Sequence, residues 1–515
     1  MKILIKNIDI IKSADTEVVK NADIGVENGR ILFIKENTRE ESTASGAFAS
    51  DATRQSDDFA LNSAMKNNSA FASDATRQSD DFALHSAMKN NNAFAPNAIK
   101  QIDDFALNSV MKNNSAFASD ATKQIDDFAP DRTIDGKGKL AIPGLVNAHC
   151  HSAMTLLRGY SDDLALEEWL FGNIIPAESM LEPGDVYWGS QLGIIEMIKS
   201  GATCYNDMYL NMDEVGRAVV ESGIRASISI GPLLSGKRGD ALVDIDGCKA
   251  FFKKWNKQAD GRITTNIEIH SLYMYTPETL IEGAKLAKEL NAPIHIHILE
   301  TAVEKKNIFE KYGKSSVELA AEYGILDTNP ILAHCVHVDE KDISIISETR
   351  ASVAHNPSSN LKLASGIAPI TEMLAAGVNV CIGTDGAASN NVLNMFKEMH
   401  LTALIHKGVK GDPTLITAKD AFKMATENGA RALGFSDCGI LEPGRKADIV
   451  ILDMDKSHLT PLHNYMSTLV YSAGGEDVDT VIVDGKLLMK NREMLIIDEE
   501  KVKSMARGIA KKFSS

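Results

Sequence analysis

Short apolar runs alternate with amphipathic segments from about residue 140 to residue 430. The runs are rich in Ile, Val and Ala and end in polar residues, a pattern typical of buried parallel β-strands. The intervening segments, such as DVYWGSQLGIIEMIKSG (185–201) and TPETLIEGAKLAKELN (276–291), repeat apolar positions at helical spacing. The predicted strands are GLVNAHCH (144–151), ATCYND (202–207), IRASISI (224–230), TTNIEIH (264–270), PIHIHIL (293–299), PILAHCVH (330–337), ASVAHNP (351–357) and VNVCIGTD (378–385). Eight such strand–helix units in succession predict an α/β fold, the (β/α)8 TIM barrel.

Strand patterns also occur at both ends of the chain. ILIKNIDII and NADIGVENGRILFIKEN lie near the start, and GILEPGRKADIVILDMD and DTVIVDGKLLM lie near the end. We therefore predict a small β-sandwich-like domain formed by both chain ends. The predicted domains are residues 1–46 with 131–143 (N-terminal part of the β-domain), 47–130 (an insertion), 144–435 (the barrel) and 436–515 (the C-terminal part of the β-domain with a C-terminal helix).

The predicted insertion is a tandem repeat of 23 residues. Phenylalanine recurs at this spacing, at positions 48, 71, 94 and 117. Each unit abounds in Ala, Ser, Asn and Asp and has few large apolar residues, so it cannot bury a core of its own. We predict a loosely helical or disordered insertion that is dispensable for chemistry, with a partner-binding module as the alternative.

Composition narrows the classes of function. The formal net charge of −16 argues against partners such as nucleic acid or an anionic membrane surface. No apolar run reaches the roughly 18 residues of a membrane span, and the N-terminal residues do not resemble an export signal. The six cysteines show no pairing pattern, so we expect reduced thiols in a cytoplasmic protein.

Histidines gather at the ends of the predicted strands. His149 and His151 are two residues apart, so on a strand they share one face. In a TIM barrel the carboxyl ends of all strands meet at one rim, where the chemistry lies. The polar residues at the ends of the other predicted strands are His270, His297, His334, His337, His355 and Asp385. Their convergence predicts a metal site.

The motifs PGLVNAHCH, HIHILET, LAHCVH, AHNPSSNLKLASGIAPI and GTDGAASNN resemble the signatures of the amidohydrolase superfamily. More narrowly, they resemble those of the 5-methylthioadenosine/S-adenosylhomocysteine deaminase family, over the whole chain except the repeats. The resemblance implies that His149, His151, His297 and Asp385 hold one divalent metal ion. Three neutral imidazoles and one carboxylate suit Zn²⁺, with Fe²⁺ as the alternative, and leave a position for a water whose pKa the metal lowers.

The resemblance also implies catalytic roles. Asp385 would bind the metal and accept the proton of the water, and His334 would orient the resulting hydroxide. Glu300 would donate a proton to the purine nitrogen N1 and later one to the departing ammonia, which requires a pKa raised by burial. The implied reaction is hydrolytic deamination at C6 of an adenosine derivative to an inosine-type product.

Contacts with the rest of the substrate are implied for a few more residues. Glu178 matches the family's acidic residue for the ribose hydroxyls, and His270 matches a substrate-contacting histidine. Trp169 is a candidate wall of the nucleoside site, with plain helix core as the alternative.

One departure from the family pattern bears on the group at the 5′ position. The family offers arginines for the homocysteine carboxylate after the third barrel strand, but Ile230 occupies one such place here. Arg238 and its neighbour Lys237 are the nearby cations, so Arg238 is a candidate contact. We therefore favour 5′-methylthioadenosine, 5′-deoxyadenosine and adenosine over S-adenosylhomocysteine as substrates.

Other functions stay open at this point. The same fold supports guanine or cytosine deamination and the dechlorination of aminotriazines, but Glu178 favours a nucleoside. A barrel that serves only as an assembly scaffold would lack ligands or Glu300, and all of them are present. The Met-rich segment NVLNMFKEMHLTALIHK is expected to pack on the barrel, with a face for forming a homo-oligomer as the alternative.

Overall fold

The computed structural model of the protein describes residues 1–37, 128–231 and 244–513. The predicted repeats and Arg238 lie outside these ranges. Residues Met1–Asn37 and Ala129–Ser515 group into one compact unit. No helix in the described ranges has the length and apolar character needed to cross a membrane. The predicted domain boundaries stay predictions.

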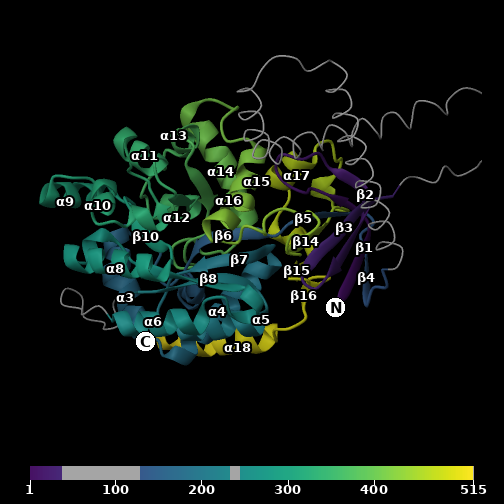
Figure 1. The fold of residues 1–515 in the computed structure, drawn as a ribbon, viewed down its shortest axis with the longest axis horizontal. Coiled ribbons are helices and arrows are strands. Elements are labelled where there is room, and N and C mark those ends of the chain that lie inside the picture. Colours follow the sequence, from purple (N-terminus) through teal and green to yellow (C-terminus); the bar gives the residue numbers. More distant parts are fainter. Residues whose placement is uncertain (38–127, 232–243, 514–515) are drawn as a thin grey trace, which may run out of the picture. The chain divides into compact units, whose positions relative to one another are not determined.

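All eight predicted barrel strands are present, as one parallel sheet in which sequence neighbours are also spatial neighbours (Figure 1). The carbonyl oxygen of His149 accepts hydrogen bonds from the N–H groups of Thr384 (3.1 Å) and Asp385 (3.0 Å), which brings the last strand's end to the first strand. The strands are β6 (Leu145–Cys150), β7 (Ala202–Asp207), β8 (Arg225–Ile230), β9 (Ile263–Ile269), β10 (Ile294–Ile298), β11 (Ile331–His334), β12 (Ser352–His355) and β13 (Asn379–Ile382). The predicted TIM barrel is therefore confirmed.

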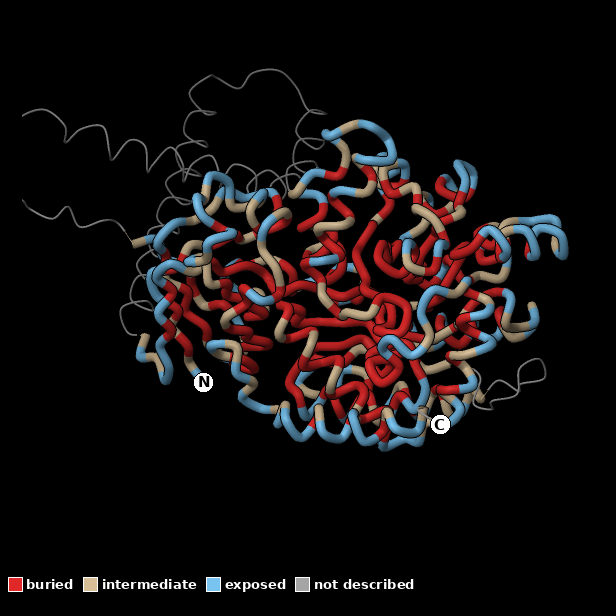
Figure 2. The backbone as a smooth tube through the Cα atoms, turned by 180° about the vertical axis from the view of Figure 1, so that it is seen from behind, coloured by how far each residue is buried: buried red, intermediate tan, exposed pale blue. Residues whose placement is uncertain are grey.

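Helices cover the outside of the barrel, so the strands are buried on both faces (Figure 2). Every residue of β6, β7, β10, β11 and β12 is buried, which explains their continuous apolar runs. The helices between strands are α3 (Ile175–Glu178), α4 (Pro183–Lys199), α5 (Met212–Ser222), α6 (Ile245–Trp255), α7 (Gln258–Gly261), α8 (Pro277–Leu290), α9 (Ala302–Tyr312), α10 (Ser316–Glu322), α11 (Glu340–Ser347), α12 (Pro357–Lys362) and α13 (Ile370–Ala375). The helices predicted at 185–201 and 276–291 are α4 and α8.

Further helices follow the last barrel strand. They are α14 (Met395–Lys410), α15 (Ala418–Ala425), α16 (Glu427–Ala432), α17 (Tyr465–Tyr471) and α18 (Glu499–Ala510). The Met-rich α14 buries Met395, Phe396 and Met399, as expected for barrel packing. The C-terminal α18 packs along α4. All six cysteines are buried and unpaired.

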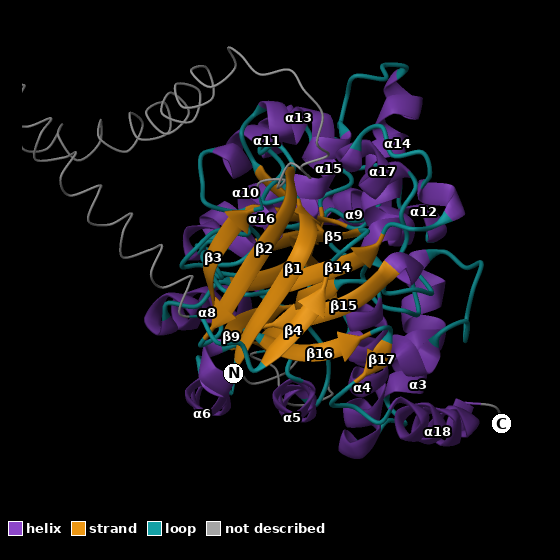
Figure 3. Cartoon of the chain, turned by 90° about the vertical axis from the view of Figure 1, so that its right-hand side faces the viewer, coloured by secondary structure: helices purple, strands orange, loops and turns teal. Residues whose placement is uncertain are grey.

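The two chain ends form the second, mixed sheet (Figure 3). Its strands are β1 (Lys2–Ile10), β2 (Val19–Glu27), β3 (Arg30–Glu36), β4 (Arg132–Asp135), β5 (Lys139–Pro143), β14 (Ile449–Asp453), β15 (Val478–Val483), β16 (Lys486–Lys490) and β17 (Glu493–Met494). They run in the order β17-β16-β15-β14-β5-β1-β2-β3, and β4 pairs with β1. Ile3 and Ile5 of β1 share one hydrophobic cluster with Ile449 and Ile451 of β14, so both halves cover a common core as the sandwich-like prediction requires.

The chain passes from this sheet into the barrel at Pro143 and Gly144. Pro143 pairs with Ile449 in the end sheet, and the next strand, β6, belongs to the barrel. At Gly144 an added Cβ would lie only 1.9 Å from Oγ1 of Thr203, so no side chain fits there. The tight junction sets the start of β6 and therefore the height of His149 and His151 in the barrel.

A buried ion pair ties the barrel to the end sheet. Arg225, the first residue of β8, donates two hydrogen bonds to Asp448, from Nε (2.8 Å) and from an Nη (3.0 Å). Their side chains are 1% and 2% exposed. Asp448 directly precedes β14 and also accepts the backbone N–H of Asp484 at 2.7 Å. A buried charge left without its partner is costly, so this contact fixes the two sheets to each other.

Asp448→Asn therefore lowers the free energy of unfolding by about 3–5 kcal/mol, because the buried guanidinium of Arg225 loses its hydrogen-bonded carboxylate and keeps only the more distant Asp484, at 3.8 Å. Chemical denaturation followed by circular dichroism measures this change. The matched control is Asp327→Asn, which breaks the exposed pair with Lys288 and costs about 1 kcal/mol or less. Equal losses in the two variants would contradict the anchoring role of the buried pair.

Candidate active site

The predicted metal-ligating residues meet at the carboxyl ends of the barrel strands. His149 lies in β6 and His151 directly follows it, His297 lies in β10, His334 ends β11 and Asp385 follows β13. The donor atoms of His149, His151 and His297 all lie within 4.8 Å of one another, and so do those of His149, His334 and Asp385. All five side chains are buried. The strand ends thus bring into one place the donors that a metal requires.

Two of the imidazoles are oriented by backbone carbonyls. The Nδ1 atom of His151 is hydrogen-bonded to the carbonyl oxygen of Met208, and Nδ1 of His297 to that of His270 at 2.7 Å. A carbonyl oxygen accepts only, so each Nδ1 carries the proton. Each Nε2 is then the ring nitrogen that remains for a metal, which binds it in its unprotonated form.

A third histidine, which the sequence analysis did not single out, orients His149. Nδ1 of His149 lies 2.8 Å from Nε2 of His295, a fully buried residue of β10. Nδ1 of His295 lies 3.4 Å from Oγ of Ser229, which itself donates to the carbonyl oxygen of Asp207. Asn206 lies 3.1 and 3.3 Å from the two ring nitrogens of His295 and so favours neither tautomer. Because the hydroxyl of Ser229 donates to Asp207, it accepts from Nδ1–H of His295. Nε2 of His295 is then unprotonated and accepts from Nδ1–H of His149.

The arrangement fits a divalent cation. Nε2 of His149 is buried without a hydrogen-bond partner and lies 3.3 Å from Oδ1 of Asp385. The same Oδ1 is 3.1 Å from Nε2 of His151. The other oxygen of Asp385, Oδ2, accepts hydrogen bonds from the hydroxyls of Ser359 (2.6 Å) and Ser389 (2.8 Å). One carboxylate oxygen therefore faces several imidazole nitrogens, as in a zinc site.

The electrostatics of these residues agree with the geometry. Burial lowers the pKa of His149 to about 4, so its ring is neutral. Burial also acts to lower the pKa of His151, but the carboxylate of Asp385 outweighs it and raises this pKa to about 9. The pKa of Asp385 itself is held well below its ordinary value by the two histidines, against the effect of burial. The carboxylate thus attracts positive charge to the centre of the cluster.

A protonatable acid stands beside the cluster. Glu300 is 7% exposed and its Oε1 lies 3.8 Å from Nδ1 of His334. Burial raises the pKa of Glu300 to about 7, so much of it is a neutral acid near neutral pH. Nδ1 of His334 is hydrogen-bonded to Oδ1 of Asn360 at 2.8 Å, so Nε2 is the ring nitrogen of His334 that remains for another partner.

The backbone is unusual at these strand ends. Leu299, His334 and Asp385 adopt left-handed conformations, with φ of 50°, 73° and 59°. Residues other than glycine rarely do so, and such strain gathers at functional sites. The turns let a side chain that follows a strand point back over the end of the barrel.

The cluster opens into a pocket of about 420 Å³ that also holds the predicted substrate residues. Trp169 lines it from a π-helical turn, and its indole N–H is buried and makes no hydrogen bond within the described ranges. Glu178, the last residue of α3, and His270, just after β9, line it as well. Of the predicted site residues, only Arg238 lies outside the described ranges.

Sequence reasoning missed several residues of this site. The lining acid Glu268 alternates with isoleucines in β9 and was treated as an ordinary strand residue. His295 shares a strand face with His297, two residues later, and this spacing was the available signal. Ser359 and Asn360 reach the cluster from α12. They lie within the motif AHNPSSNLKLASGIAPI, which carries the family resemblance but does not by itself indicate a role for them at the site. In contrast, His337 and His355 lie outside the donor cluster. Nε2 of His337 lies 2.8 Å from the carbonyl oxygen of Ser365, and Nε2 of His355 lies 3.4 Å from Nε2 of His406.

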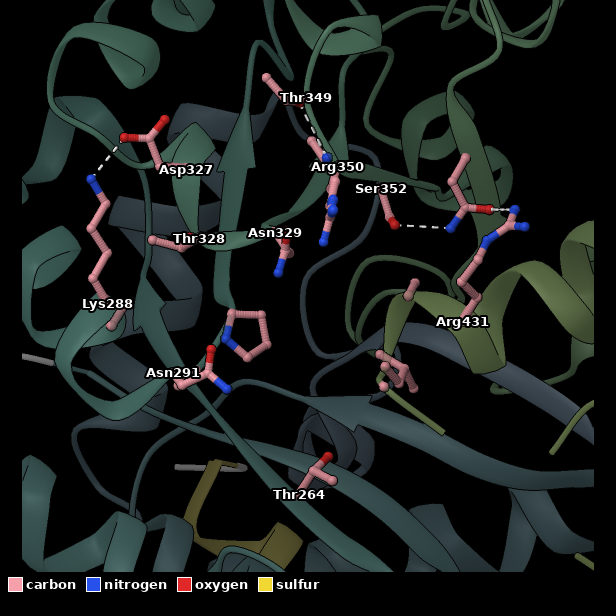
Figure 4. Close-up of a pocket in the computed structure, with 18 of the residues that line it drawn as sticks. Thr264, Lys288, Asn291, Asp327, Thr328, Asn329, Thr349, Arg350, Ser352 and Arg431 are labelled. Carbon is pink, nitrogen blue, oxygen red and sulfur yellow. Dashed lines mark hydrogen bonds and ion pairs between the residues drawn. The ribbon is translucent and has the colours of Figure 1, made fainter. Parts of the chain in front are cut away.

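A larger hollow, of about 1010 Å³, lies at the opposite end of the barrel strands (Figure 4). Some of its charged side chains are engaged: Lys288 pairs with Asp327 at 2.7 Å, and Arg431 contacts Asn379. The residue groups able to hold a metal in the described ranges lie around the other pocket. The hollow is therefore large, but its described lining residues include no group of side chains able to hold a metal ion.

Known proteins share both the sequence and the fold. The model of the amidohydrolase family matches residues 140–488. A 5-methylthioadenosine/S-adenosylhomocysteine deaminase of Acetivibrio thermocellus is 55% identical over 383 residues, which are 74% of this chain and 88% of that protein. The protein of the same name in Dictyoglomus thermophilum is 50% identical over 372 residues, 72% of this chain and 87% of its own.

A solved structure also resembles the protein. The crystal structure of an adenosine deaminase from Xanthomonas campestris with bound zinc superposes with a TM-score of 0.79 at 28% identity, covering 99% of this chain and 98% of that one. The long match at high identity and the shared barrel agree with the motifs that end the strands. The chain belongs to the amidohydrolase family and, within it, groups with the 5-methylthioadenosine/S-adenosylhomocysteine deaminases.

Proposed function

We propose that the protein hydrolyses the C6 amino group of an adenosine derivative, releasing ammonia and an inosine-type nucleoside. The observation that carries the proposal is the meeting of imidazole nitrogens and a carboxylate oxygen beside the buried acid Glu300, in one pocket. The relatives named as deaminases of adenosine derivatives support it. Preferred substrates are 5′-methylthioadenosine, 5′-deoxyadenosine and adenosine.

His149, His151, His297 and Asp385 would hold one divalent ion, with Zn²⁺ favoured over Fe²⁺ because imidazole nitrogens dominate the donor set. When bound, such an ion supplies hydroxide at neutral pH by lowering the pKa of a water. The protein contributes the orientation of the rings, through His295 and two backbone carbonyls.

The remaining steps belong to side chains. Asp385 takes the proton that leaves the attacking water, while Glu300 donates its own to N1 of the purine as the oxygen adds to C6. His334 stabilises the oxygen at C6 through its Nε2, since Asn360 holds its Nδ1. The C6–N6 bond then breaks as Glu300, now a carboxylate, takes up the hydroxyl proton at C6 and passes it to the leaving amine, so that ammonia departs and a C6 carbonyl remains. The proton held by Asp385 then restores the acid form of Glu300.

Contacts farther from C6 place the nucleoside. Glu178 would accept hydrogen bonds from the ribose hydroxyls, and His270 would contact the purine side of the substrate. Trp169 offers an aromatic face and a free indole N–H to the pocket. A buried donor without a partner is costly, so a substrate acceptor at this position would contribute to binding.

The purified protein with its metal content measured should release ammonia from at least one of adenosine, 5′-methylthioadenosine, 5′-deoxyadenosine and S-adenosylhomocysteine, but not from guanine or cytosine. Glu300→Gln should keep the metal and lower kcat by about 10²–10⁴-fold, because an amide cannot donate the proton to N1. Ammonia release and the ultraviolet change from adenine to hypoxanthine measure both.

The control is Glu310→Gln, an exposed acid of α9, which should retain full activity. Metal-loaded protein that leaves every adenosine unchanged would refute the proposal. Turnover of guanine or cytosine instead would redirect it to another amidohydrolase reaction.

His295 gives a separate prediction about metal affinity. His295→Leu removes the acceptor for Nδ1 of His149 and should weaken Zn²⁺ binding by about 10–100-fold. His295→Gln should weaken it less, since its amide oxygen can accept the same hydrogen bond. Competition with a chromophoric chelator measures the dissociation constants.

His355→Leu is the matched control, because His355 is an equally buried histidine of the next strand but one and lies outside the donor cluster. It should leave the zinc affinity unchanged. Equal affinities for His295→Leu and the parent protein would show that the His149–His295 contact does not orient the ligand.

A further inference from the structure

One partly buried acid in the pocket has no part in the proposed chemistry. Glu268 lies in β9, where Asn266 and His270 share its strand face. Asn266 donates to Oδ1 of Asn206 inside the barrel at 2.9 Å, and His270 lines the pocket. The register therefore turns Glu268 inward, and it lines the pocket too.

Glu268 stands across the pocket from the metal-binding carboxylate. Its strand, β9, is four places from β13 in a ring of eight strands, and Asp385 follows β13. It lies beside the end of β8: a Cβ added to Gly231 would be 3.8 Å from the Glu268 carboxyl carbon. Glu300 follows β10, the neighbour of β9, so a nucleoside whose C6 lies between Asp385 and Glu300 has room to extend its other end along the β8–β9 side of the pocket, where Glu268 is.

The surroundings of Glu268 leave its carboxyl group for a ligand. Within the described ranges it makes no side-chain hydrogen bond or ion pair, although it is largely enclosed. Burial, followed by the repulsion of Asp207 and Glu178, raises its pKa to about 7, while His151 acts in the opposite direction. A carboxyl group so placed is stabilised by a hydrogen-bond donor or a positive charge.

The charge of the whole pocket also favours a positively charged group over a negatively charged one. Its described lining includes four carboxyl groups and neither lysine nor arginine; the acids are Glu178, Glu268, Glu300 and Asp385. A bound metal offsets charge near Asp385, but the described lining offers no lysine or arginine to offset Glu178 and Glu268. A negatively charged group placed beside them would lose hydration and meet repulsion.

We propose that Glu268 is a specificity-determining residue that selects the 5′ group of the nucleoside by charge. It favours a positively charged or hydrogen-bond-donating 5′ group over a neutral one, and a neutral one over a carboxylate. The inference rests on the proposed deaminase function and specifies its substrate class.

The test compares kcat/KM for three nucleosides: 5′-amino-5′-deoxyadenosine, 5′-methylthioadenosine and adenosine 5′-carboxylic acid. The parent protein should use the amino compound over the carboxylic acid by at least about tenfold, the scale of one screened charge contact. Glu268→Gln should lower this ratio by about tenfold, mainly through KM. Because both rates come from one preparation, the ratio does not depend on how much of the variant is folded.

Glu282→Gln is the matched control: it removes an exposed acid from α8, the helix that packs on β9, and should leave the ratio unchanged. A Glu268→Gln ratio equal to that of the parent, or a parent that prefers the carboxylic acid, would overturn the role of Glu268 while the deaminase function stands. Failure to deaminate any of the three, as well as adenosine itself, would overturn the proposed function and this inference together.

Discussion

The structure depends on holding neutral imidazole lone pairs and a carboxylate oxygen face to face inside a barrel. Burial alone would make such a cluster unfavourable, because each polar atom loses its water. The protein offsets this by binding the far side of each group: carbonyl oxygens hold His151 and His297, His295 holds His149, and two serine hydroxyls hold Asp385. The atoms of these side chains that face the centre of the cluster have no such partner, and a cation bound there would coordinate them.

The chemistry and the choice of substrate come from different parts of the same pocket. Donors at the ends of β6, β10 and β13 and the acid Glu300 serve the reacting carbon. Under the proposed function, the side formed by Glu178 and Glu268 would face the remainder of the nucleoside. Such a division lets the charge of the second side change without disturbing the ligands, which is how one barrel supports many substrates.

Much of this was predictable because the signals are local. Parallel strands covered on both faces read as continuous apolar runs, and polar residues at their ends mark the rim, so the barrel and the presence of a metal site followed from the pattern. The choice of four ligands among those polar residues came from the family resemblance. The insertion of β5 between β1 and β14 was not predictable, since it joins strands some 300 residues apart. The left-handed backbone at His334 and Asp385 and the hydrogen bond from Ser359 arise only when distant loops pack together. Glu268 was hidden because a lone acid among isoleucines looks like a solvent-facing strand position.

The most direct test of the account is a titration of metal-free protein with Zn²⁺, in which the rate of ammonia release from the best nucleoside substrate is followed at each addition. A single metal site predicts no turnover without metal, a linear rise in the rate as Zn²⁺ is added, and a plateau at one equivalent per chain. Full activity in the metal-free protein, or a plateau only at two equivalents, would contradict a single-metal site built from His149, His151, His297 and Asp385.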